Sequence, residues 1–157
     1  MKRALRRGTA SGAGGEVYEW STLANGVRVA TARLDRVRSV CVALWAGVGG
    51  RHERSVECGV AHFLEHMLFK GTGRRSAKEI SRAVESVGGY LNAFTTEDHT
   101  CFYAKAAAVR LERVLEVLSD MYVAPRLDAR DVTREREVIH RRLRPVGITP
   151  GSMWTSC

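Results

Sequence analysis

The order of the apolar runs is the feature that most constrains the fold of this 157-residue chain. Alternating or β-branched runs predict strands, and apolar residues at helical spacing predict helices. In chain order they predict a hairpin at 17–34, a strand at 39–48, helices at 60–70 and 76–88, strands at 90–95 and 100–105, and helices at 111–121 and from 128 to 139. Because strands and helices come in blocks and no Gly-rich phosphate loop follows a strand, the sequence predicts an α+β fold.

Two local signals mark where these elements begin and turn. Asn25-Gly26 lies between two extended runs and predicts a tight hairpin turn. Ser76 is followed three residues later by Glu79, which predicts a capping box at the start of the second helix.

The distribution of charge argues against a nucleic-acid-binding module. The formal net charge is +8, of which residues 1–15 contribute +4, residues 124–157 contribute +3, and residues 16–123 only +1. The excess therefore lies at the two ends and forms no stripe on the folded part. No apolar run is long enough to cross a bilayer, so we also expect no membrane span.

Cysteine usage and the first residues bear on the cellular compartment. The four cysteines form no C-x-x-C pair, and Cys41 and Cys101 lie in strand-type runs where a free cysteine is usually a small core residue. This favours a reducing compartment. The Arg-rich, acid-free residues 1–15 suit either a transit peptide or a disordered bacterial N-terminus. We therefore expect a bacterial cytoplasm, with the mitochondrial matrix as the alternative.

The segment His62-Phe-Leu-Glu65-His66 carries the most chemical information. On a helix, His62 and His66 are one turn apart and project from one face, so both imidazoles can reach one metal ion. Glu65 would be the base that takes a proton from the attacking water. H-x-x-E-H is the inverted form of the zinc-peptidase motif H-E-x-x-H. Taken alone, the segment could also be two surface histidines on an amphipathic helix.

Longer stretches around this motif resemble a known family. They read WAGVGGRHERSVECGVAHFLEHMLFKGT, VGGYLNAFTTEDHTCFYAK and LERVLEVLSDMYVAPRLD followed by REREVI. Together they resemble the pitrilysin/insulinase family of zinc metallopeptidases, above all its processing-peptidase branch, which includes the β-subunit of mitochondrial processing peptidase and bacterial relatives. The resemblance runs from Leu23 to Ile139. It implies a truncated N-terminal domain of the processing-peptidase-like metallohydrolase fold, with helices packed on an antiparallel or mixed sheet.

The resemblance also implies roles for individual residues. It makes His62 and His66 ligands of Zn²⁺ and Glu65 the general base. Glu135, in the stretch RERE, matches a carboxylate behind the site that would act in catalysis by orienting a ligand or tuning the metal. Without the resemblance, Glu135 would be read as part of a solvated helix face.

Substrate and partners follow from the same comparison. Asn92 and Ala93, in GYLNAFT, match an edge strand that pairs with an extended substrate backbone. The expected substrate is a peptide or an unfolded protein. Family members carry a second homologous half, so a second peptidase-like half or subunit is the expected partner.

The third zinc ligand is where the chain departs from the family pattern. The family has a glutamate one turn after the isoleucine of its last helix, and here Arg142 holds that place after Ile139. An arginine is a permanent cation with no lone pair to offer a metal. His140 is an alternative donor, but two positions along a helix turn it by roughly 160° from the required direction.

The last residues suggest a change of reading frame. The likeness stops abruptly after Ile139, and codons shifted by one base over residues 147–157 permit D-H-P-G-F-D-V-D-E-L, which resembles the family beyond its ligand helix. The same frame permits a glutamate at the junction of Arg141 and Arg142. An ordinary divergent C-terminus is the alternative. The expected division is a disordered basic lead-in at 1–15, an incomplete peptidase domain at 16–143 and an aberrant tail at 144–157.

Two functions from different classes remain. The first is a zinc metalloendopeptidase that hydrolyses peptide bonds of extended polypeptides, weakly active or inactive in this truncated chain. The second is a non-catalytic peptidase-like fragment or partner subunit that binds peptides without cleavage. The intact segment from His62 to His66 favours the first.

Overall fold

The computed structural model describes residues 6–11 and 17–143, and the chain forms two units, residues 1–38 and 39–157. The boundary between them lies within the stretch 16–143 that the sequence assigned to one domain. The tail expected at 144–157 lies outside the described residues.

The first unit is an antiparallel sheet of β1 (Arg6–Ser11), β2 (Val17–Thr22) and β3 (Arg28–Ala32), in that order. β1 lies inside residues 1–15, for which the sequence predicted disorder. Pairing with the whole length of β2 explains the strand, because backbone groups make the ladder and basic side chains do not prevent it.

The turn between β2 and β3 forms at the predicted position. Leu23 and Val27 close it through a hydrogen bond from the Leu23 N–H to the Val27 carbonyl, 2.8 Å long. Gly26 has φ of +88°, a left-handed conformation that glycine adopts without strain. The side chain of Asn25 accepts a hydrogen bond from the Val27 N–H. The predicted hairpin is confirmed.

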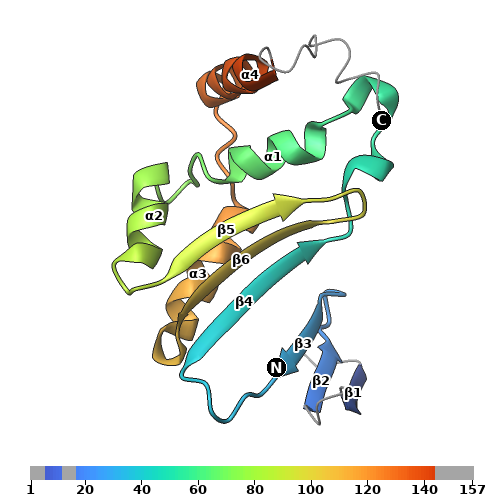
Figure 1. The fold of residues 1–157 in the computed structure, drawn as a ribbon, viewed down its shortest axis with the longest axis vertical. Coiled ribbons are helices and arrows are strands. Elements are labelled where there is room, and N and C mark those ends of the chain that lie inside the picture. The colour runs from blue at the N-terminus through green and yellow to red at the C-terminus, as the bar shows by residue number, and fades with distance from the viewer. Residues whose placement is uncertain (1–5, 12–16, 144–157) are drawn as a thin grey trace. The chain divides into compact units, whose positions relative to one another are not determined.

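The second unit is built on a sheet with the order β4-β6-β5, antiparallel throughout (Figure 1). Its strands are β4 (Ser39–Ala46), β5 (Tyr90–Thr95) and β6 (Thr100–Ala107). β6 is the central strand of this sheet, so β5 keeps one edge without a partner strand from within it.

Four helices accompany this sheet, as the sequence predicted. They are α1 (Val60–Leu68), α2 (Ala77–Glu85), α3 (Leu111–Val123) and α4 (Ala129–Leu143). Ser76 caps α2 in a complete capping box with Glu79. The α+β class is confirmed.

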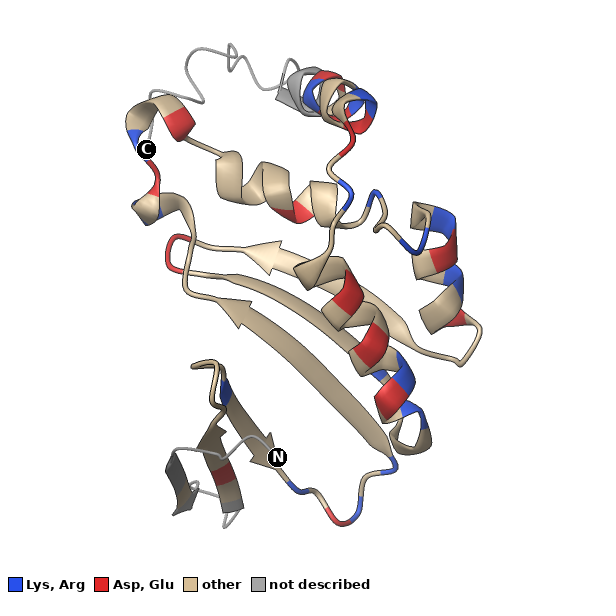
Figure 2. Ribbon diagram, turned by 180° about the vertical axis from the view of Figure 1, so that it is seen from behind, with Lys and Arg blue, Asp and Glu red and all other residues tan. Residues whose placement is uncertain are grey.

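The hydrophobic core lies between one face of this sheet and helices α2 and α3. Figure 2 shows α3 running along the sheet. Every second residue of each strand faces the helices, as the strand period requires. The buried core residues are Ile80, Ala83, Val84, Phe102, Ala104, Ala106, Val114, Val117, Leu118 and Met121.

The opposite face of the sheet carries aromatic side chains. Trp45 on β4 meets Phe94 on β5 edge to face, with ring centroids 5.8 Å apart. Trp45 stays 61% exposed and Tyr90 53% exposed. The strand register places Cys101 on this face, opposite Trp45.

The two strand cysteines differ in environment. Cys101 is buried, as expected, and is 1% exposed. Cys41 is exposed, so the expectation that it is a core residue is wrong. It lies opposite Lys105, and the solvated lysine marks this position of the sheet as one that the core does not reach.

Candidate metal centre

A carboxylate from the preceding loop holds the start of helix α1. Glu53 accepts hydrogen bonds from the backbone N–H groups of Gly59 and Ala61, the latter 2.6 Å long. These donors belong to the first turn of the helix, where N–H groups have no partner inside the helix and a negative charge is favourable. At the inner face of α1, Ala61 and Met67 are buried. The helix that carries the motif is therefore held at its start and along one side.

His62 and His66 bring their ring nitrogens together on the other side of α1. Their Nε2 atoms lie 3.0 Å apart, and the ring centroids are 4.7 Å apart. Zinc bonds of 2.0–2.1 Å in a tetrahedral site separate two nitrogens by about 3.3 Å. The two imidazoles are thus arranged as a pair that can share one ion.

Glu135 of α4 lies behind this pair. Its Oε1 is 2.7 Å from Nδ1 of His66, and its Oε2 is 2.5 Å from Nζ of Lys70. Burial raises the pKa of this carboxyl, but hydrogen bonds from Lys70 and His66 outweigh burial and lower its pKa below the ordinary value. A carboxylate at Nδ1 favours the tautomer with the proton there, which leaves the lone pair of Nε2 directed at His62.

Glu65 is held by a residue of the edge strand β5. Thr95 on β5 donates its hydroxyl to Oε2 of Glu65 over 2.6 Å. Thr95 also lies beside Thr100, whose hydroxyl donates to the carbonyl of Val48. One oxygen of Glu65 is therefore fixed by the sheet, and the side chain is half-buried.

The residues present fit zinc in donor type and in support. Two imidazole nitrogens converge, and one of them has the hydrogen-bonded carboxylate that accompanies most zinc-bound histidines. Among the residues that the structure describes, no group of three His, Cys, Asp or Glu side chains completes the site. Arg142 and His140 lie in the last turns of α4, and their side chains are outside the described part.

Asn92 and Ala93 lie on β5, one of the two edge strands of this sheet. The side-chain amide of Asn92 donates to the hydroxyl of Tyr90 over 2.7 Å. The N–H of Ala93 donates to Oδ1 of Asn92 over 2.9 Å, so this N–H points to the open edge and takes no part in the ladder with β6. The edge therefore offers a backbone donor that one side-chain rotation uncovers.

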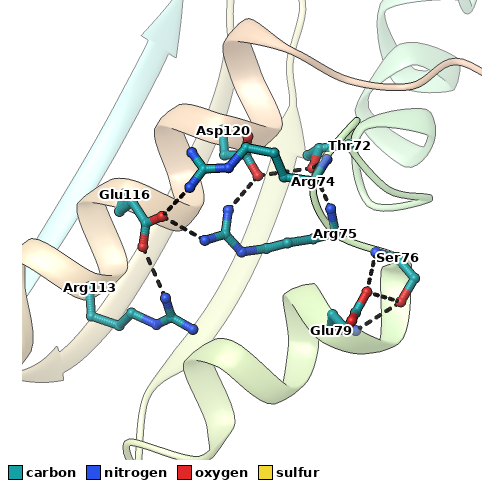
Figure 3. Close-up of polar contacts among 8 residues, drawn as sticks. All are labelled: Thr72, Arg74, Arg75, Ser76, Glu79, Arg113, Glu116 and Asp120. Atoms are coloured by element: carbon teal, nitrogen blue, oxygen red, sulfur yellow. Dashed lines mark hydrogen bonds and ion pairs between the residues drawn. The ribbon is translucent and has the colours of Figure 1, made fainter.

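A polar cluster holds the loop after α1 against α3 (Figure 3). Asp120, with a side chain 4% exposed, accepts hydrogen bonds from the Thr72 hydroxyl at 2.9 Å and from Arg75 at 2.5 Å. Arg75 also reaches Glu116 at 2.6 Å. Burial raises the pKa of Asp120, but the hydrogen bonds from Thr72 and Arg75 lower it further than burial raises it.

The same loop is joined to the segment that leads into α4. The N–H of Arg126 donates to the carbonyl of Gly71 over 2.9 Å, and Thr72 pairs with Pro125 in an isolated bridge. The end of α1 and the approach to α4 are thus tied together. The connection therefore lies between the helix that carries His66 and the helix that carries Glu135.

Sequence reasoning missed three residues of the site. Lys70 lies four residues after His66, and this helical spacing could have indicated it. Thr95 and Glu53 gave no local signal, because their partners lie 30 residues away for Thr95 and six to eight residues away for Glu53.

Comparison with known proteins identifies the family. Residues 28–150 match the family model described as "Insulinase (Peptidase family M16)". An uncharacterised zinc protease of Mycobacterium leprae is 45% identical over 76% of this chain and 27% of its own length. A probable mitochondrial-processing peptidase subunit beta of Arabidopsis thaliana is 39% identical over 80% of this chain and 24% of its own.

A solved structure agrees with these sequence matches. The crystal structure of a protease from Helicobacter pylori superposes with a TM-score of 0.79 and 31% identity, and the match covers 87% of this chain and 33% of that one. The chain thus spans from 24% to 33% of the length of these relatives. In the part of the chain that the structure describes, no helix has both the length and the apolar character of a membrane span. By this family match, the chain belongs to the insulinase family of peptidases, family M16.

Proposed function

We propose that this chain carries the metal-binding part of a zinc metalloendopeptidase. The observation that carries the proposal is the convergence of the His62 and His66 Nε2 atoms at 3.0 Å, with Glu135 on the far nitrogen of His66. The names of the relatives as zinc proteases support the same metal.

In this proposal each residue has one task. His62 and His66 hold the ion, and Glu135 orients His66. When bound, Zn²⁺ lowers the pKa of water toward 7 and polarises a carbonyl. Glu65 accepts the proton of the attacking water with the oxygen that Thr95 leaves unoccupied, and it can return this proton to the leaving amine.

The open edge of β5 would bind the substrate. An extended peptide or unfolded protein can add a strand there, because main-chain donors and acceptors then pair without regard to sequence. The Ala93 N–H becomes available when Asn92 turns away. Asn92 would then be free to bind the peptide with its amide.

The activity of the whole protein involves more chain than is present here. A second peptidase-like half or subunit would close over the peptide, as the resemblance implies, and the interior of a bacterial cell is the proposed location. Arg142 at the position of the third ligand would leave this chain weakly active or inactive.

A non-catalytic peptide-binding role is the second candidate. It is favoured by the edge of β5, which has no partner strand within its sheet and whose main-chain groups need no metal to bind a peptide. The chain would then bind extended peptides with equal affinity with and without zinc.

One experiment separates these functions. The chain is incubated with zinc and an internally quenched, unstructured peptide, and cleavage and binding are followed together, with Glu65→Gln as the matched control. Slow cleavage that the control loses would support the peptidase. Peptide binding of equal affinity with and without zinc, with no cleavage in either protein, would support the second candidate. Absence of zinc binding would overturn the proposal.

A further inference from the structure

We propose that Lys70 is a positioning residue of the metal centre, which anchors Glu135 so that Glu135 can orient His66. The inference rests on the proposed function, because it assigns His66 to a metal. It goes beyond that function because neither the motif nor the proposed site includes Lys70.

The carboxylate of Glu135 has two oxygens, and each has one partner. Oε1 is 2.7 Å from His66 Nδ1, and Oε2 is 2.5 Å from Lys70 Nζ. The side chain of Glu135 is only 4% exposed, so water has little access to replace either partner. Lys70 therefore determines the rotation of the carboxylate that His66 meets.

The spacing along α1 makes this arrangement possible. His62, His66 and Lys70 follow one another at intervals of four residues, which places them along one side of a helix. Lys70 lies two residues beyond the end of α1, and its N–H donates to the Met67 carbonyl over 3.0 Å, so the backbone continues the last turn. The carboxylate of Glu135 can then bridge His66 and Lys70.

A solvent-exposed ion pair would contribute little to stability. In this pair, however, the carboxylate of Glu135 is buried. Without Lys70, one oxygen of a buried carboxylate would lose its donor. An unpaired buried charge is costly, so Glu135 would turn to recover a partner and would give up its alignment with His66.

A positioning role of Lys70 and a purely electrostatic role predict opposite changes in metal affinity when Lys70 is replaced. The ammonium is a positive charge near the site of a cation, so its loss by charge alone would strengthen metal binding. Loss of positioning would weaken metal binding, because partners that orient a ligand typically contribute ten- to hundredfold in affinity. The sign of the change therefore decides between the two.

The test titrates Co²⁺, which reports coordination through its visible spectrum, into the full chain and its variants. Lys70→Met should weaken Co²⁺ binding by about ten- to hundredfold, and Lys70→Arg should restore it. Lys78→Met removes an exposed lysine of α2 and should leave binding unchanged. Thermal melts of all variants show whether each is folded, and Lys70→Gln replaces Lys70→Met if the latter is not.

A metal-free measurement separates this inference from the proposed function. Long-range ¹H–¹⁵N spectra of the histidine rings should show the tautomer with Nδ1–H at His66 in the parent chain and a mixture in Lys70→Met. A parent chain that binds no Co²⁺ would overturn the proposed function, and the inference with it. If the parent binds Co²⁺ but Lys70→Met binds equally or more tightly, or keeps the tautomer, Lys70 has no positioning role.

Discussion

His66 Nδ1 on α1 and Glu135 Oε1 on α4 lie 2.7 Å apart, although 69 positions separate the two residues in the chain. The contact joins the helix that carries the H-x-x-E-H motif to the last described helix. It also gives each histidine of the motif a different environment, since His62 is exposed and His66 is largely covered. The metal-binding properties of the chain should therefore depend on α4 as well as on the motif.

Zinc binding should separate the ligands from the base. His62→Ala and His66→Ala each remove one of two converging nitrogens and should abolish measurable zinc binding. Glu65→Gln should leave the affinity within about threefold, or ~0.65 kcal/mol, because Thr95 can still hydrogen-bond to the amide oxygen. Competition with a chromophoric chelator measures all three. Loss of zinc in Glu65→Gln as complete as in the histidine variants would show that Glu65 is a ligand.

Arg142→Glu should increase zinc affinity. Exchange of a cation for a carboxylate would supply a third donor and change the local charge, so we expect at least a tenfold gain, or ~1.4 kcal/mol. The same chelator competition applies, and Arg144→Glu controls for a general effect of charge. Equal affinity in Arg142→Glu and the parent would mean that residue 142 does not face the metal.

Asp120→Ala should destabilise the second unit. The substitution leaves the buried Thr72 hydroxyl without its acceptor and removes one of the two acidic partners of Arg75, which should cost about 2 kcal/mol in the free energy of unfolding. Urea denaturation measures the loss. Asp120→Asn keeps an acceptor for Thr72 and should lose less, while Glu112→Ala on the exposed face of α3 should have little effect. A loss in Glu112→Ala as large as in Asp120→Ala would contradict the special role of the cluster.

Stability should fall as the solution becomes acidic. Arg75 lowers the pKa of Glu116 through hydrogen bonding, and the pKa of Asp120 is lowered as well, so both carboxyls bind protons more weakly in the folded than in the unfolded chain. The two carboxylates contribute fully to the free energy of unfolding above their ordinary pKa values, 4.5 for Glu116 and 3.8 for Asp120. This contribution is lost as the pH falls through the lowered pKa values of the folded chain. The urea concentration at half-unfolding should decrease as the pH is lowered from 7 to 3. The decrease per pH unit should be smaller in Asp120→Asn than in the parent. An equal slope in parent and variant would exclude Asp120 as a source.

The two strand cysteines should react at different rates. Burial raises the pKa of the Cys101 thiol, and its side chain is inaccessible, whereas Cys41 is exposed. Since the thiolate is the reactive form, iodoacetamide at pH 8 should modify Cys41 at least tenfold faster than Cys101, a difference of ~1.4 kcal/mol in activation free energy. Peptide mapping by mass spectrometry measures both sites, and unfolding in guanidinium should remove the difference. Comparable rates in the folded chain would show that the sheet opens readily around Cys101.

The sequence by itself determined the elements whose signals are local. The turn at Asn25-Gly26, the capping box of Ser76 with Glu79, and the placing of two histidines on one helical face all depend on residues within four positions of one another. Backbone geometry alone then fixes the outcome, and the structure has these features where the sequence predicted them. The resemblance to the family added what these local patterns cannot supply, namely the expected place of Glu135 and the edge strand.

Only the tertiary structure decided how distant segments support the motif. Thr95 meets Glu65, Asp120 meets Thr72, and Lys70 shares Glu135 with His66. Each contact depends on the packing of a helix against the sheet, a loop or another helix. A single charged or hydroxyl residue carries no periodic pattern that predicts its partner. Cys41 is the converse case, because its apolar run predicted burial, yet it is exposed opposite Lys105, whereas Cys101 on the same face is buried opposite Trp45.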